Sequence, residues 1–404
     1  MKSSFRFIIV ASCLFTMANP AHTQWVQTTL TDHYVEAFAV SGSILFAGTN
    51  GGGVYMSTNN GSSWNAVNIG LTDTVVTALA VSGTNLFAST SHRGVFLSTN
   101  NGTSWTEVDS GLTNTAVSAL AVLGTNLFAG TGGGGVFLST NSGTSWTAVN
   151  SGLTGHFVSS LAVSGTNLFA GTVIRGVSLS TDNGTSWTQV IGSSSSTVYA
   201  LAFSGTNFFV GTNDGGVSLS TDNGTSWTEV DSGLTNTNIR ALAFSGTNLF
   251  AGTYGGGVFL TTNNGTSWTA ASTGLTKTHV YALALSGTNV FAGTDGGVFR
   301  RALSELEGVK DASSQLPTSY ELQQNYPNPF TPSTTISYAL PHRSHVALTL
   351  FNTLGQKVAQ LVNGDIDAGF HEIQFNATNL ASGVYFYRIQ ARSYVETKRL
   401  LVLR

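Results

Sequence analysis

Val76-Thr-Ala-Leu-Ala-Val-Ser-Gly-Thr-Asn-Leu-Phe-Ala-Ser-Thr90 opens a unit, ending near Asn114, that recurs along most of the chain. The unit reads as an inner strand, a Ser-Gly-Thr-Asn turn, a second strand, a loop, a third strand (Gly94 to Ser98) and a fourth strand from Trp105. Four short β-rich segments separated by Gly and Asn turns predict one blade of a β-propeller.

The spacing of the tryptophans gives the period of this repeat. The seven tryptophans are Trp25, Trp64, Trp105, Trp146, Trp187, Trp227 and Trp268, spaced by 39, 41, 41, 41, 40 and 41 residues. A second marker, Phe-Ala/Val-Gly/Ser-Thr, also occurs seven times, first at Phe46 and last at Phe291. A period near 41 residues with short β segments is typical of propeller blades rather than of stacked helix pairs.

The two markers are out of phase at the ends of the repeat region. Trp25 precedes the first Phe marker, and no Trp follows the last one. We therefore expect the segment at Trp25 to supply the fourth strand of a blade whose other strands come from Val280 to Arg301. This three-plus-one closure leaves no open sheet edge. The sequence predicts an all-β protein with a seven-bladed β-propeller over residues 25–303.

The turn that precedes each later Trp carries a family resemblance. Ser57-Thr-Asn-Asn-Gly-Ser-Ser-Trp64 and Ser180-Thr-Asp-Asn-Gly-Thr-Ser-Trp187 resemble the Asp box, Ser-x-Asp-x-Gly-x-Thr-Trp, of BNR-repeat propellers. Of the six copies, only those with Asp182 and Asp222 keep the Asp, but Asn accepts the same backbone hydrogen bonds. In the families that share the box it is structural and far from the ligand site. The resemblance therefore implies a scaffold role here.

Composition and the first residues indicate export. The chain has 404 residues, a formal charge of -3 and 9% charged residues, so no basic excess points to nucleic acid. Lys2 and Arg6, an apolar run and the small residues Ala18 and Ala21 read as a secretory signal peptide over residues 1–21. The sole cysteine, Cys13, lies inside that run, so we expect no disulfide in the mature chain. A lipoprotein reading of Cys13 is the alternative.

The C-terminal region resembles a second family. Five of the six prolines follow Leu316, and residues 304–324 read as a linker. Asn325-Tyr-Pro-Asn-Pro-Phe330, Leu354-Gly-Gln-Lys-Val358 and Leu380-Ala-Ser-Gly-Val-Tyr385 resemble, in order and spacing, the C-terminal sorting domain of type IX secretion cargo. The resemblance implies a secreted or outer-membrane surface protein of a Gram-negative bacterium, with the type IX machinery and a sortase as partners.

The same region has its own strand pattern. Residues 325–404 contain segments that alternate apolar with polar residues and are interrupted by Gly, Asn or Pro, which predicts a small Ig-like β-sandwich. A purely structural sandwich module is the alternative, because β-sandwiches serve many functions.

Comparison of the repeats with one another separates scaffold from variable positions. The turn between the first two strands is nearly constant, as in Ser82 to Asn85 and Ser164 to Asn167, whereas the loops at the opposite end of each blade differ. The position before the Ala-Leu-Ala core varies as well and should ring the mouth of the central channel, reading Glu36, Thr77, Ser118, Ser159, Tyr199, Arg240 and Tyr281. The candidate ligand-binding residues are Tyr34, His92, Arg93, Arg175, Tyr199, Asp214, Arg240, Tyr254, His279 and Tyr281. Solvated loop positions are the alternative for each of them.

Two functions are open at this mouth. The first is recognition of a glycan or a protein without catalysis, with tyrosines stacking on the ligand and arginines binding carboxylates. The second is glycoside hydrolysis, for which Glu36 and Asp295 are the weak candidate pair, because a glycosidase needs two carboxyl groups across the scissile bond. The sialidase pattern is not met, since Arg93, Arg175 and Arg240 fall on blades two, four and six without an Arg-Ile-Pro motif. Whether the protein is an enzyme stays open, and we favour the first function.

The remaining expectations concern metals, cofactors and assembly. The propeller histidines share no spacing typical of metal ligands, so no metal and no cofactor is expected. We expect a monomer that binds an as yet unspecified glycan or protein and no nucleic acid.

Overall fold

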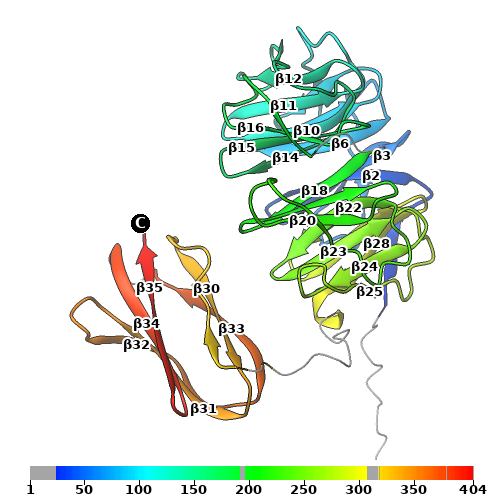
Figure 1. The fold of residues 1–404 in the computed structure, drawn as a ribbon. Coiled ribbons are helices and arrows are strands. Elements are labelled where there is room, and N and C mark those ends of the chain that lie inside the picture. Colours follow the sequence, from blue (N-terminus) through cyan, green and yellow to red (C-terminus); the bar gives the residue numbers. More distant parts are fainter. Residues whose placement is uncertain (1–23, 192–195, 307–316, 318, 379, 404) are drawn as a thin grey trace, which may run out of the picture. The chain divides into compact units, whose positions relative to one another are not determined.

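The protein was analysed as a computed structural model that describes residues 24–191, 196–306, 317, 319–378 and 380–403. These residues form two compact units, one containing strands β1 to β28 and the other β29 to β35 (Figure 1). Strands dominate both units, and the one helical element described is the short 3₁₀ turn η1 (Leu303–Glu305). The all-β prediction is therefore confirmed. The expected signal peptide and much of the expected linker lie outside the described residues.

Six of the four-stranded sheets consist of consecutive strands. They are β2–β5 (Tyr34–Ser41, Ile44–Asn50, Gly53–Ser57, Asn65–Ala66), β6–β9 (Val76–Ser82, Asn85–Thr90, Val95–Ser98, Thr106–Glu107), β10–β13 (Val117–Leu123, Asn126–Thr131, Gly135–Ser139, Thr147–Ala148), β14–β17 (Val158–Ser164, Asn167–Thr172, Val177–Ser180, Thr188–Ile191), β18–β21 (Val198–Ser204, Asn207–Thr212, Val217–Ser220, Thr228–Glu229) and β22–β25 (Ile239–Ser245, Asn248–Thr253, Gly257–Thr261, Thr269–Ala270). Each is an antiparallel meander that corresponds to one repeat of the sequence. We call each such sheet a blade, numbered along the chain.

The seventh blade joins the two ends of the repeat region. Its strands are β26 (Val280–Ser286), β27 (Asn289–Thr294), β28 (Gly297–Ala302) and, from the N-terminal end, β1 (Val26–Thr31). Strand β1 pairs antiparallel with β28, with Val26 opposite Arg300 and Gln27 opposite Phe299. The inner strands contact one another in the order β2, β6, β10, β14, β18, β22 and β26, and β26 returns to β2. The ring is thus closed by the three-plus-one pairing that the markers predicted.

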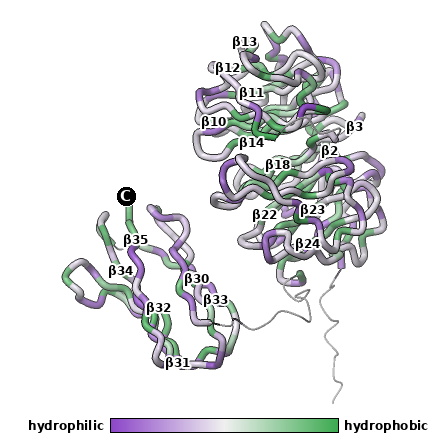
Figure 2. Tube along the Cα trace, in the orientation of Figure 1, coloured by the Kyte–Doolittle hydropathy of each residue, from purple (hydrophilic) through white to green (hydrophobic). Residues whose placement is uncertain are grey.

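Apolar packing between neighbouring blades holds the ring together. The second strand of each blade is almost entirely buried, and Phe46, Phe87, Phe128, Phe169 and Phe250 are among the most buried large side chains. Figure 2 shows hydrophobic colour along the inner strands, such as β14, and hydrophilic colour at many turns. At Gly48 the next blade approaches so closely that a Cβ would lie 2.6 Å from Cγ1 of Val76. This contact accounts for the small residue in the Phe-Ala-Gly-Thr marker.

The turns that resemble the Asp box, together with the tryptophans that follow them, connect neighbouring blades. In the turn after β20, Gly224 N–H donates to the Ser220 hydroxyl at 2.8 Å, and Ser226 N–H donates to Oδ1 of Asp222 at 2.9 Å. The indole of Trp105 donates to the Val67 carbonyl of the preceding blade at 2.7 Å. The corresponding tryptophans of later blades repeat this bond. The tryptophans therefore join successive blades, as a structural role for the turn predicts.

Asp222 is expected to make its turn acid-sensitive. Hydrogen bonds from Ser226 lower its pKa from 3.8 to about 2, so the carboxylate stabilises the fold above its unfolded pKa. That contribution is lost as the pH falls through the folded value near 2. The melting temperature should therefore fall less between pH 4 and pH 2 in Asp222→Asn than in the wild type. Asn100→Asp is the reciprocal control, because Asn100 forms the same turn with Ser104, and this variant should gain acid sensitivity. Identical acid profiles for all three proteins would contradict the assignment.

The C-terminal unit is a sandwich of two sheets over one core. One sheet has the order β29 (Glu321–Leu322), β30 (Ser333–Leu340) and β33 (Gly369–Asn376), and the other has the order β32 (Lys357–Ile366), β31 (Ser344–Phe351), β34 (Gly383–Ala391) and β35 (Tyr394–Val402). Both sheets contribute to a single apolar cluster that includes Ile336, Leu348 and Ile389. Asn325 of the Asn-Tyr-Pro-Asn-Pro-Phe motif is buried, and its N–H donates to the Tyr387 hydroxyl at 2.8 Å. Within this unit the motif therefore closes the core.

Candidate functional site

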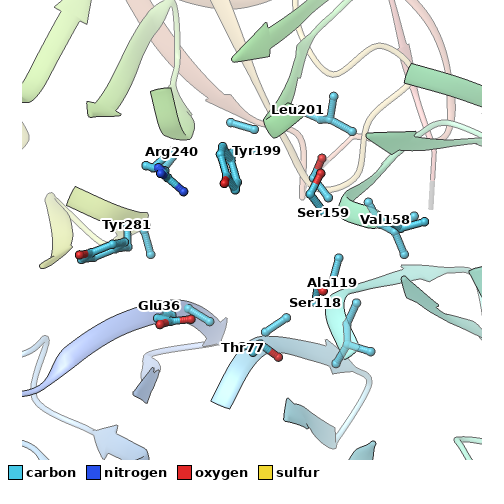
Figure 3. Close-up of a pocket in the computed structure, with 18 of the residues that line it drawn as sticks. Glu36, Thr77, Ser118, Ala119, Val158, Ser159, Tyr199, Leu201, Arg240 and Tyr281 are labelled. Carbon is cyan, nitrogen blue, oxygen red and sulfur yellow. The ribbon is translucent and has the colours of Figure 1, made fainter. Parts of the chain in front are cut away.

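A cavity of about 830 Å³ opens where the seven inner strands meet. One residue from each blade lines it at the same position of the repeat, and these are Glu36, Thr77, Ser118, Ser159, Tyr199, Arg240 and Tyr281. Figure 3 shows the seven side chains standing around the opening. The residues expected to ring the channel mouth are thus brought together. We call this set the mouth ring.

A β-bulge places every member of the mouth ring. In each inner strand the register with the second strand shifts across that one residue, for example between Val198 and Ala200 around Tyr199, and between Ile239 and Ala241 around Arg240. The same shift occurs in the other five blades. A bulged residue is left out of the regular ladder, and its side chain is re-aimed. The repeated bulge explains how seven unlike side chains share one location.

Arg240 is the centre of an aromatic cluster on one side of the mouth. Its guanidinium carbon lies 3.9 Å from the centroid of the Tyr199 ring and 5.1 Å from that of Tyr254. Its Nε donates to Oδ1 of Asn238 at 3.0 Å. In the described part of the chain no carboxylate lies within ion-pair distance of Arg240 and its two terminal nitrogens make no hydrogen bond. The rings and Asn238 hold the guanidinium in place, while its terminal nitrogens remain available to a ligand.

Tyrosines extend this cluster across the seam between blades seven and one. The ring of Tyr281 lies 6.0 Å from Tyr254 and 6.1 Å from Tyr34, centroid to centroid. Burial, with smaller contributions from Tyr254 and Asp295, raises the pKa of Tyr281 to about 12. Its hydroxyl therefore stays protonated at physiological pH and can donate a hydrogen bond. Tyr34, Tyr199, Arg240, Tyr254 and Tyr281 together are called the aromatic half of the mouth.

The two carboxylates singled out in the sequence differ in their surroundings. Glu36 lines the cavity and accepts a hydrogen bond from Nδ2 of Asn50 at 2.9 Å. Asp295 is not among the cavity-lining residues, and its Oδ2 lies 3.0 Å from Nδ1 of His279. The His279 ring in turn packs against Tyr254 at 4.3 Å. Asp295 therefore contacts the aromatic half through His279 and does not line the cavity, whereas Glu36 does.

The other candidate residues lie apart from this cluster. His92 pairs with Asp73 at 3.2 Å, and Arg93 lies 4.0 Å from Glu107, both in blade two. Asp214 accepts a hydrogen bond from Ser196. Arg175 lies in the loop between β15 and β16 and does not line the cavity. The structure brings together five of the ten candidate ligand-binding residues directly and His279 through its contact with Tyr254.

The opposite side of the mouth carries residues that the sequence analysis did not select. Phe157 and Val173 line the cavity, and the Phe157 side chain is 61% exposed. Ile174, next to Val173, is 55% exposed. Internal comparison contains the signal, because Phe157 holds the position occupied by Val75 and Ala116 in the two preceding blades. We call Phe157, Val173 and Ile174 the apolar half of the mouth.

Two further findings concern the described residues. They contain no group of three or more His, Cys, Asp or Glu side chains arranged to hold a metal ion. None of their helices has the length and apolar character needed to cross a membrane.

Comparisons with known proteins define the class of the chain. Residues 324–403 match the family of secretion system C-terminal sorting domains, so the chain is a β-propeller fused to a type IX sorting domain. This domain indicates export by the type IX route to the cell surface or the medium. No curated protein matches the chain.

Solved structures show the same propeller fold at low sequence identity. YCF48 bound to D1 peptide is 16% identical, with a TM-score of 0.57 over 69% of this chain and 96% of its own. The extracellular domain of BT3049 from Bacteroides thetaiotaomicron, named as a putative hybrid two component system, is 15% identical, with a TM-score of 0.59 over 94% of this chain and 57% of its own. The GH74 xyloglucanase from Xanthomonas campestris is 16% identical, with a TM-score of 0.56 over 92% of this chain and 66% of its own. At these identities the likeness concerns the fold.

Proposed function

We propose that the chain is a secreted or cell-surface recognition protein that binds its ligand, without catalysis, at the mouth of the propeller. The observation that carries this proposal is Arg240, whose guanidinium lies against the rings of Tyr199 and Tyr254 and whose terminal nitrogens make no hydrogen bond among the described residues. A cation fixed by its neighbours before the ligand arrives loses little conformational entropy on binding. Such preorganisation is typical of a binding anchor.

The surroundings of the carboxylates support recognition over hydrolysis. A glycosidase needs two carboxyl groups that both face the substrate. Glu36 lines the cavity, whereas Asp295 does not line it and is hydrogen-bonded to His279. The neighbouring folds include both a peptide complex and a xyloglucanase, so glycoside hydrolysis remains the second candidate function.

Export sets the proposed partners outside the cell. The sorting domain engages the type IX machinery, and we propose that a sortase then removes it and that the propeller acts as a monomer. A glycan array and a peptide array probed with the mature chain would test for a ligand.

Substitution at the mouth separates the two functions. Tyr281→Ala and Arg240→Ala are each expected to weaken ligand binding by about 1 to 3 kcal/mol, the range for buried aromatic and Arg anchors. Glu36→Gln and Asp295→Asn should change it little, because the amides keep most of the shape and hydrogen bonding. Calorimetric titration with the array-selected ligand measures these effects. The proposal fails if the mature chain hydrolyses an aryl glycoside and both amide variants abolish that turnover while remaining folded.

A further inference from the structure

The mouth has two chemically different sides that share one cavity. The aromatic half presents the terminal guanidinium nitrogens of Arg240, which bind no other residue in the described part of the chain, and the apolar half presents Phe157 and Val173. Between them, Glu36 has one oxygen bound by Asn50, and its other oxygen accepts no hydrogen bond from the residues that the structure describes. A complementary ligand therefore combines an anionic group, an apolar group and a hydrogen-bond donor.

We infer that the ligand is a peptide segment in which an acidic side chain stands near an aliphatic or aromatic one. This inference rests on the recognition function proposed above and names its ligand class. The carboxylate of the acidic side chain would bind the guanidinium of Arg240, and the apolar side chain would pack against Phe157 and Val173. Backbone N–H groups of the peptide would donate to Glu36. Peptides combine these groups within a few residues.

The contacts that the aromatic rings already make disfavour a sugar as the ligand of the mouth. Sugar binding needs open ring faces, but Arg240 covers one face of Tyr199, and Tyr254 packs against both Arg240 and His279. Two of the mouth-ring hydroxyls, those of Thr77 and Ser159, also donate to backbone carbonyls of the next blade. A neutral glycan supplies no anion for Arg240.

The experiment uses the chain without its signal peptide, from residue 22 to residue 404. This protein is probed with an array of ten-residue peptides that contain Glu and Leu at varied spacing. Matched peptides carry Gln for Glu or Ser for Leu, and a glycan array is probed in parallel. We expect binding to peptides that carry both residues, with a loss of about tenfold in affinity for either replacement.

Protein variants assign each preference to a side of the mouth. Arg240→Gln should bind the Glu and Gln peptides equally, and Phe157→Ser should bind the Leu and Ser peptides equally. Arg93→Gln is the matched control, because Arg93 lies near Glu107 and outside the cavity. Ile69→Ser is the control for Phe157, since Ile69 is 73% exposed and does not line the cavity. Both controls should keep the wild-type preferences.

The outcomes separate this inference from the proposed function. Peptide binding without preference for Glu or Leu, or binding to glycans alone, overturns the peptide assignment and leaves a recognition protein. Preferences that survive in Arg240→Gln and Phe157→Ser also overturn it, because the ligand then binds elsewhere. If neither array binds and the chain hydrolyses an aryl glycoside, both the inference and the proposed function are wrong.

Discussion

Removing the closing strand, Trp25 to Thr31, is expected to destabilise the propeller by at least about 3 kcal/mol. Trp25 is buried, its indole donates to the Ala271 carbonyl at 2.6 Å, and its backbone N–H donates to the Thr273 carbonyl at 2.8 Å. Deletion leaves a cavity in the apolar cluster between blades six and seven and exposes the unpaired edge of β28. Blade seven would then lose its backbone pairing with the N-terminal segment and depend on the packing of β26 against β2 to close the ring.

The measurement uses the fact that all seven tryptophans belong to the propeller. Tryptophan fluorescence in urea therefore reports the unfolding of the propeller. The sorting domain has no Trp and contributes nothing to this signal. Two proteins are compared, both without the signal peptide. One begins at residue 24 and keeps β1, and the other begins at residue 32 and lacks β1. Trp146→Ala is the control, because it removes the same buried ring from a blade that is continuous in sequence. Equal unfolding midpoints for the two lengths would show that β1 does not close the ring.

Removing residues 325–404 is expected to retain the folded propeller in the periplasm. The sorting domain has its own apolar core, and the chain divides into two compact units. Deletion is therefore expected to remove the export signal and to leave the propeller folded. Cell fractionation with antibody against the propeller measures the result, and the tryptophan assay confirms that the retained protein is folded.

A point substitution tests whether export needs the folded sorting domain. Tyr387 is fully buried, and its hydroxyl donates to the Gln323 carbonyl at 2.7 Å. Tyr387→Ala should unfold the domain and reproduce the deletion, whereas Tyr326→Ala, at a side chain 77% exposed, should leave the domain folded. Surface delivery of the protein that lacks residues 325–404 would contradict the assignment of routing to this domain.

The repeat markers predict the ring because they report positions that every blade must satisfy. Trp25 indicated the closing strand from the sequence alone. The extra Trp before the first blade and the missing Trp after the last blade are both explained if the N-terminal segment supplies the fourth strand of blade seven. The sandwich followed from the alternation of apolar and polar residues in the same way, and β31 shows this alternation as buried residues at every second position.

The site was less accessible to sequence reasoning for a physical reason. Variation among repeats located Tyr199, Arg240 and Tyr281, because positions free of packing constraints differ between blades. It also selected His92 and Arg93, which vary but bind their neighbours in blade two. It missed Phe157, whose exposure depends on the loop of the preceding blade, where Gly132 pairs with it. Variation marks freedom from packing, and only the spatial arrangement tells which free side chains meet.

The seven bulges give the mouth ring a property that matters for its evolution. Because each bulged residue stands outside the regular strand ladder, its side chain can be exchanged with little effect on the pairing that builds the blade. The natural ring already holds glutamate, threonine, serine, tyrosine and arginine in one backbone setting. Specificity can therefore drift one blade at a time, and a library randomised at these seven positions should yield folded rings with new ligands.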